Sequence, residues 1–204
     1  MICLQIAVET RIRASEGRAR VARRLGSRSV HLELERDTAK SFPPVDDPVS
    51  VTSARVWMCK YRSLAPLAAL TNLRVLEIAN YPDPTLDPLA SLSELEELRI
   101  LHLPKVDDLA PLSRLVRLHR LALATLPGWD ASGKVTQVHS LDPITQLPSL
   151  ERLELYGVVP PDRSVESILQ SRSLREVRVS KYPRAEVTRL LPVWFGPSPP
   201  GLSH

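Results

Sequence analysis

Residues 64–78 read Leu-Ala-Pro-Leu-Ala-Ala-Leu-Thr-Asn-Leu-Arg-Val-Leu-Glu-Ile, and this stretch decides the fold. Its leucines recur every third residue as far as Leu76, where the apolar spacing shortens to two, at Ile78. A spacing of two is typical of a strand, in which alternate side chains point to opposite faces. The stretch therefore predicts a turn-like segment that leads into a short strand.

The same pattern returns along the chain at a nearly constant interval. Prolines in the matching position fall at residues 44, 66, 88, 111 and 143, so the steps are 22, 22, 23 and 32 residues. The apolar frame of Leu73, Leu76 and Ile78 has counterparts at Leu32 and Leu34, Val51, Ala54 and Val56, Leu95, Leu98 and Ile100, Leu118, Leu121 and Leu123, Leu150, Leu153 and Leu155, and Leu174, Val177 and Val179. We therefore predict seven units of about 22 residues, one of which carries an insertion of about ten residues. Amphipathic leucine-rich helices are the alternative, but proline at this interval would break them.

Composition agrees with a repeated small motif. The chain of 204 residues has 33 leucines, against 2 Phe, 3 Trp and 4 Tyr, and its 19 prolines exclude one long helix. A single unit cannot bury its own leucines, so the core forms where units stack. Within the turns, we expect Asp87 and Asp142 to cap helical turns that start at Pro88 and Pro143.

The pattern Leu-x-x-Leu-x-Leu at a period of 22 resembles the leucine-rich repeat family, and residues 64–78 resemble its internalin-like class, a bacterial type. The resemblance implies an α/β solenoid, a horseshoe with a parallel β-sheet on the concave face and short helical or 3-10 turns on the convex face. The family usually places Asn or Cys five residues after the central leucine, where the side chain bonds to neighbouring turns. That column here reads Asp37, Cys59, Tyr81, Leu103, Leu126, Val158 and Tyr182, so we expect water or irregular turns to satisfy much of the backbone there.

Three regions follow from this register. Residues 1–28 are expected to cap the first unit with an alternating strand from Ile2 to Val8 and a basic helix from near Ser15 to Leu25. Residues 29–190 hold the repeats, with the insertion near 127–140. Residues 191–204 are expected to be the remnant of a C-terminal cap and a disordered tail, and the apolar residues expected to close the last unit are Val187, Leu190, Leu191, Val193, Trp194 and Phe195.

Charge is unevenly distributed along the chain. The net charge is +4, but residues 1–28 hold seven arginines and two acidic residues, a net of +5, which leaves −1 for the rest. The basic balance therefore does not identify the main body as a nucleic-acid binder. The two cysteines form neither a disulfide framework nor a metal-binding pattern, and the first residues lack the pattern of a secretory signal, so a cytoplasmic location is expected.

In the implied horseshoe, residues between the core leucines face outward on the concave sheet and form columns. One column reads Arg55, Glu77, Arg99, Ala122, Glu154 and Arg178, with alternating charges. The next reads Trp57, Ala79, Leu101, Ala124, Tyr156 and Ser180, with large apolar groups separated by small ones. Aromatic residues are enriched at binding hot spots, so these columns are the predicted partner-binding surface. The alternative is that Trp57 packs beneath the N-terminal cap and that Leu101 and Tyr156 are ordinary surface residues.

The insertion is a second candidate site. Insertions within repeats often project as loops on a binding face, and Trp129 would serve as an anchor near the tip. The alternative is a tolerated loop whose Trp129 folds back onto the repeats.

Catalysis has little support in the sequence. None of the five histidines falls in a metal-ligand motif, and His102 near Asp107 and Asp108 is a weak candidate for a site. Cys59 lies in the core ladder, which predicts a buried thiol, not a nucleophile. We predict no catalytic residue, no metal and no cofactor.

The rival hypothesis concerns the N-terminal arginines. Residues 18–30 resemble the first half of a bacterial helix-turn-helix, but a strand pattern in repeat register, Val-His-Leu-Glu-Leu-Glu, replaces the second half. A basic capping helix is the simpler interpretation. The sequence thus predicts a non-catalytic protein-interaction module that binds another protein as a monomer, with no membrane partner. Binding of nucleic acid or an anionic surface through the arginine-rich segment is the alternative.

Overall fold

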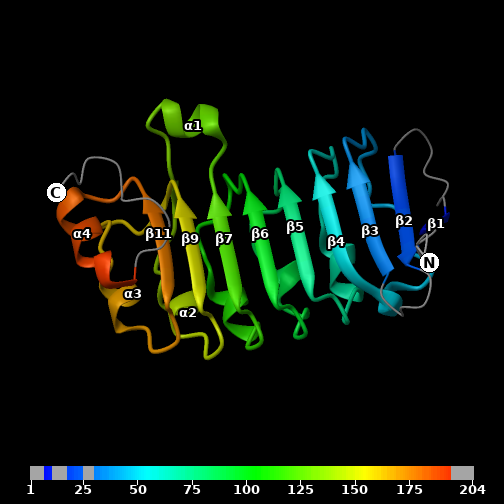
Figure 1. The fold of residues 1–204 in the computed structure, drawn as a ribbon. Coiled ribbons are helices and arrows are strands. Elements are labelled where there is room, and N and C mark those ends of the chain that lie inside the picture. The colour runs from blue at the N-terminus through cyan, green and yellow to red at the C-terminus, as the bar shows by residue number, and fades with distance from the viewer. Residues whose placement is uncertain (1–6, 11–17, 25–29, 194–204) are drawn as a thin grey trace, which may run out of the picture.

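Parallel strands in repeat register form the body of the molecule. The computed structural model describes residues 7–10, 18–24 and 30–193. Seven of its strands pair side by side in chain order (Figure 1), and they are β3 (Val30–Glu35), β4 (Val51–Trp57), β5 (Val75–Ala79), β6 (Glu97–Leu101), β7 (Arg120–Ala124), β9 (Arg152–Tyr156) and β11 (Glu176–Ser180). Leu76 pairs with Ala54 on one side and Leu98 on the other, so the predicted register is confirmed. The fold is a leucine-rich repeat solenoid.

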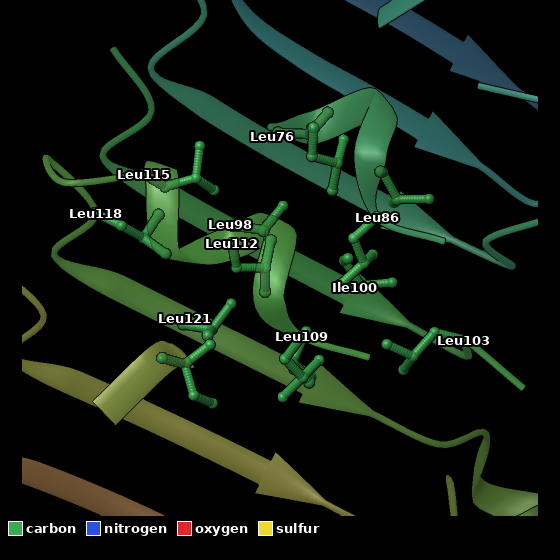
Figure 2. Packing of buried hydrophobic residues seen from close by; sticks show 14 of the residues in the cluster. Leu76, Leu86, Leu98, Ile100, Leu103, Leu109, Leu112, Leu115, Leu118 and Leu121 are labelled. Carbon is green, nitrogen blue, oxygen red and sulfur yellow. The ribbon is translucent and has the colours of Figure 1, made fainter. Parts of the chain in front are cut away.

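The return segments are short helices and 3-10 turns, as expected. The 3-10 turns span Pro48–Ser50, Ala65–Ala69, Asp87–Leu89, Ala110–Arg114 and Leu191–Val193, and the helices are α1 (Pro127–Ala131), α2 (Asp142–Thr145), α3 (Glu166–Gln170) and α4 (Arg184–Arg189). Their inward leucines meet those of the strands to form one continuous core (Figure 2), in which Leu86, Leu89, Leu109 and Leu112 are fully buried. Stacking of the units, as the leucine spacing predicts, is what removes these side chains from water.

The expected capping by aspartate is wrong. Leu86 and Leu141 occupy the N-cap positions without a side-chain hydrogen bond, and Asp87 and Asp142 lie one place later, in the first turn. In the first turn, their negative charges still interact favourably with the positive end of the aligned peptide dipoles. In the α2 turn, the polar side chain one residue before the N-cap takes over the capping role, because Ser140 Oγ accepts the Asp142 N–H at 3.0 Å.

The N-terminal basic segment is a strand, and the predicted helix is wrong over these residues. β2 (Arg18–Arg24) pairs antiparallel with β3, and β1 (Ala7–Thr10) pairs antiparallel with β2. Ala19 and Val21 lie opposite Leu34 and Leu32 in this register. A strand here covers the edge of β3, which a capping helix would leave without backbone partners. The helix on which the helix-turn-helix resemblance depended is therefore not formed in residues 18–24, and residues 1–6, 11–17 and 25–29 lie outside the described part.

The insertion leaves the sheet and returns to it. It contains α1, which Figure 1 shows beyond the C-terminal ends of β7 and β9, and β8 (Thr136–Gln137), which pairs in parallel with β10 (Val158–Val159). At the C-terminal end, Leu190 is fully buried and Val187 and Val193 pack against the core, as predicted, whereas Leu191 is exposed. Trp194 and Phe195 lie outside the described residues.

Most strands of the sheet are followed by a residue in the left-handed conformation. Arg36, Met58, Asn80, His102, Gly157 and Lys181 have φ between 50° and 70°. The N–H groups of Arg36, Met58, Asn80 and His102 donate to the last carbonyl of the next strand at 2.6–3.1 Å. After β7, Thr125 is the buried residue and Leu126 is only half-buried, so the predicted column is shifted there by one place. The turns therefore pair backbone groups just beyond the strands, and in the predicted ladder column Asp37 and Cys59 also bond to backbone groups through their side chains.

Candidate functional site

The outward face of the sheet carries the predicted columns in the predicted order. Arg55, Glu77, Arg99, Ala122, Glu154 and Arg178 are successive register partners, and so are Trp57, Ala79, Leu101, Ala124, Tyr156 and Ser180. Register also adds Glu33 to the first column and Glu35 to the second. Neighbours in a column lie about 4.8 Å apart, so their side chains interact directly.

Ion pairs tie the first column together at its N-terminal end. Arg55 lies 3.1 Å from Glu33 and 3.2 Å from Glu77, and Arg99 lies 3.6 Å from Glu77. Glu77 therefore faces two arginines, and its side chain is 29% exposed. The charges at this end are paired within the sheet before a partner arrives.

Trp57 is packed into the same end of the face. The Arg55 guanidinium lies 4.4 Å from the centre of the Trp57 ring, a cation–π contact, and the same arginine is held by two carboxylates. Ala79 is the register partner of Trp57 and is only 1% exposed, so neighbouring side chains cover Ala79. This packing supports the structural role for Trp57, although it leaves the indole half-buried and accessible to a partner.

The middle of the face is open. β7 contributes two alanines, Ala122 and Ala124, where its neighbours contribute Arg99 and Leu101 on one side and Glu154 on the other. A hollow of about 360 Å³ lies over these strands, and its exposed lining comes from Val75, Glu77, Glu97, Arg99, Arg120, Ala122, Arg152 and Glu154. We call this the central hollow.

The two columns predicted from the sequence do not include all residues that line the central hollow. Val75, Glu97, Arg120 and Arg152 form a third outward column, in register between Ser53 and Glu176. These residues lie two places before the charged column, so the period-2 alternation of each strand already contained the signal. Within this column, Arg120 Nη1 donates to Glu97 Oε1 at 2.8 Å, and Arg152 pairs with Glu176.

Tyr156 lies on β9 two places beyond Glu154, which lines the hollow. Burial and the neighbouring Glu154 raise the pKa of its hydroxyl, whereas Arg178 and Arg99 oppose that shift. The Arg178 guanidinium lies 5.9 Å from the centre of the Tyr156 ring. The phenol is therefore half-buried among charged groups and stays protonated at neutral pH.

Trp129 folds back onto the repeats. Its ring meets the His102 imidazole edge to face, with 4.8 Å between ring centres, and Lys134 Nζ lies 5.7 Å from the indole centre. Burial lowers the pKa of His102, and its Nδ1 atom is buried without a hydrogen-bond partner among the described residues. The indole is thus an anchor for the insertion on the sheet, and its outer part remains accessible.

The described residues contain no cluster of three or more His, Cys, Asp or Glu side chains that could hold a metal ion. His102 does not pair with Asp107; instead His139 lies 3.8 Å from that carboxylate. Cys59 is buried, and its thiol donates to the Leu34 carbonyl at 3.4 Å. Burial raises the pKa of this thiol, which disfavours the thiolate. In the part of the chain that the structure describes, no helix is long and apolar enough to span a bilayer.

Comparison with known proteins finds likeness in structure alone. No family model and no curated protein matches the chain. Internalin C2 of Listeria monocytogenes is 24% identical, covers 64% of this chain and 52% of its own, and has a TM-score of 0.46. Internalin F of the same organism is 19% identical and covers 73% and 47%, with a TM-score of 0.43. The leucine-rich repeat domain of the type III effector XopL is 22% identical and covers 73% and 59%, with a TM-score of 0.45.

The chain therefore spans about half the length of the structures that it resembles. Its fold assignment rests on its own 22-residue register, on seven parallel strands and on the leucine stack that joins them to short return turns. Together these features give the chain a leucine-rich repeat fold.

Proposed function

We propose that this chain is a non-catalytic interaction module that binds another protein through the concave face, with the central hollow as the main contact and the α1 insertion beside it. The observation that carries the proposal is the central hollow itself. It lies over β7, where two alanines stand between longer side chains of β6 and β9. Partly exposed apolar surface with a polar rim is typical of a protein-binding site.

The predicted site residues divide into two groups on this proposal. Arg99 and Glu154 line the hollow, Leu101 and Tyr156 lie two places further along the same strands, and we assign all four direct contact with the partner. Arg55, Trp57 and Glu77 hold the adjoining end of the face in shape through the contacts described above. Trp129, which packs against His102, and Arg178, beside Tyr156, lie outside the lining of the hollow, and we assign them peripheral contacts.

We further propose that the protein works as a monomer in a reducing compartment such as the cytoplasm, without a cofactor. Support comes from Cys59, a buried thiol that forms no disulfide among the described residues. The distribution of charge bears on the kind of partner and favours a protein over a nucleic acid. Acidic residues alternate with arginines across the concave face, which disfavours a nucleic-acid backbone as partner.

A selection from a displayed library of random linear peptides tests the proposal. The wild-type chain is the bait, and enriched peptides are then measured against Ala122→Arg, which fills the hollow, and against Val116→Arg, at an exposed position outside the sheet. Thermal melts establish that both variants fold. We expect peptides that bind wild type and Val116→Arg but lose at least tenfold in affinity for Ala122→Arg. Enriched peptides that bind all three proteins equally, or no enrichment at all, would refute a binding role for the hollow.

A further inference from the structure

We propose that the central hollow recognises a carboxylate on a linear segment of the partner protein, through Arg99 and Arg120. This inference rests on the proposed function and adds the chemistry of the partner. Arg99 and Arg120 lie on adjacent strands around Ala122, Arg99 as its direct neighbour on β6 and Arg120 two residues before it on β7. Both line the hollow.

The two arginines have unused hydrogen-bonding capacity. A guanidinium carries five N–H donors. Within the described residues, Arg99 has one acidic neighbour, Glu77, at 3.6 Å, and Arg120 makes one hydrogen bond, to Glu97. The side chains of Arg99 and Arg120 are 64% and 57% exposed. Exposed N–H groups beside the apolar surface at Ala122 favour a ligand that carries hydrogen-bond acceptors.

The acidic residues nearby are less available than the arginines. Glu77 faces both Arg55 and Arg99, and Glu97 accepts from Arg120. Glu154 lies close enough to Tyr156 to raise the pKa of its hydroxyl. Arg99 and Arg120 are more exposed than Glu77 and Glu97, although arginines and glutamates are equal in number along the lining of the hollow.

The same arrangement selects a single carboxylate over a polyanion. A chain of phosphates crossing the strands would meet Glu77, Glu97 and Glu154 within a few ångströms of the arginines that it needs. One carboxylate above Ala122 avoids them and takes charge-assisted bonds from two guanidinium groups. Val75, which is exposed on the same face, offers an apolar contact to a neighbouring side chain of the ligand. The expected ligand is thus a short segment with Asp or Glu beside an apolar residue.

The peptides from the selection above provide the test. We expect those that discriminate against Ala122→Arg to share an Asp or Glu, and replacement of that residue by its amide to weaken binding about tenfold or more. Arg99→Gln and Arg120→Gln should each weaken the unmodified peptide to a similar degree and the amide peptide little. Arg114→Gln, on an exposed 3-10 turn, is the matched control and should change nothing.

The possible failures are distinguishable. If hollow-dependent peptides share no carboxylate, or if the amide peptides bind as well as the acidic ones, the carboxylate inference is wrong while the interaction surface stands. If duplex DNA of random sequence binds the wild-type chain and competes with the peptides, phosphate is the preferred ligand and the inference is likewise wrong. If no peptide distinguishes Ala122→Arg from wild type, the proposed function fails, and the inference fails with it.

Discussion

Leu98 lies in the middle of the leucine stack, between Leu76 and Leu121 in the register. It is 2% exposed, and the units on both sides depend on its volume. We expect Leu98→Ala to lower the free energy of unfolding by about 2–5 kcal/mol, because the truncated side chain leaves a cavity that a stacked core cannot collapse to fill. Urea denaturation measures the change. Val116→Ala, at a position 49% exposed, is the control and should stay within about 0.5 kcal/mol of wild type.

His102 should make stability dependent on pH. Burial lowers its pKa below the ordinary value of 6.5, so the unfolded chain binds a proton more readily than the folded one. The free energy of unfolding should therefore fall as pH decreases from 7 to 5, the range in which an unfolded histidine becomes protonated. His102→Gln should reduce this dependence, as followed by urea denaturation at both pH values. His119→Gln, an exposed site, should retain it, and equal pH dependence in both variants would contradict the prediction.

Gly157 occupies a position where a side chain has no room. Its φ is +68°, and a Cβ atom there would lie 2.5 Å from Thr125 Oγ1. A left-handed conformation costs a residue with a Cβ about 1–2 kcal/mol, and we expect Gly157→Ala to destabilise the fold by more than this because of the contact with Thr125. Gly133→Ala separates the two effects, since Gly133 has φ +77° but open space around it. Comparable thermal melts for the two variants would show that the contact with Thr125 relaxes at little cost.

At the scale of elements, the turns after β3 and β4 form a buried polar cluster. The Tyr61 hydroxyl donates to Asp37 Oδ2 at 2.7 Å, and the Ala39 N–H donates to Asp37 Oδ1 at 2.9 Å. Tyr61→Phe leaves a fully buried carboxyl group with one partner fewer, so we expect a loss of about 1–3 kcal/mol in the free energy of unfolding. Tyr81→Phe is the comparison, because the acceptor that the Tyr81 hydroxyl has among the described residues is the neutral Thr85 carbonyl. Guanidinium unfolding should show the smaller change for Tyr81→Phe.

The repeat elements were predictable because each rests on a local pattern that recurs. The spacing of apolar residues predicted where the strand of each repeat unit lies, and the proline predicted the turn that precedes it. β2 was not predictable in this way, since Ala and Arg favour helices and the strand exists through pairing with β3. The alternation of Arg18, Ala19, Arg20 and Val21 was the available signal. Likewise, no sequence pattern indicated that Trp129 would rest on His102, because α1 and β6 meet only in three dimensions.

At the scale of the whole molecule, the N-terminal hairpin protects one edge of the sheet. β2 pairs with β3, whose other edge pairs with β4. A chain that lacks residues 1–29 would expose the hydrogen-bonding groups of β3, so we expect it to self-associate and to melt at a lower temperature than the full chain. Light scattering coupled to gel filtration, together with a thermal melt, tests this expectation. A monomeric truncated chain with an unchanged melt would show that β3 needs no cover.

The candidate site could be predicted only in part from sequence, for a related reason. Column membership follows from the register, so Arg99, Leu101, Glu154 and Tyr156 were correctly placed on one face. Which part of the face is filled and which is open depends on how arginine and glutamate side chains pair across strands. The Arg55 guanidinium lies over the Trp57 ring, whereas Ala122 lines the central hollow. Such choices among side-chain conformations are invisible to a pattern of residue types.

The insertion between β7 and β8 shows how this architecture tolerates added length. β7 and β9 pair in full register although about ten extra residues separate them, and the adjoining strands are undisturbed. The edge of the sheet from which α1 emerges is therefore a natural place for grafting. A foreign loop installed in place of residues 127–134 would be presented beside the concave face on a rigid support. The molecule could in this way serve as a scaffold for engineered recognition, with the leucine stack left intact.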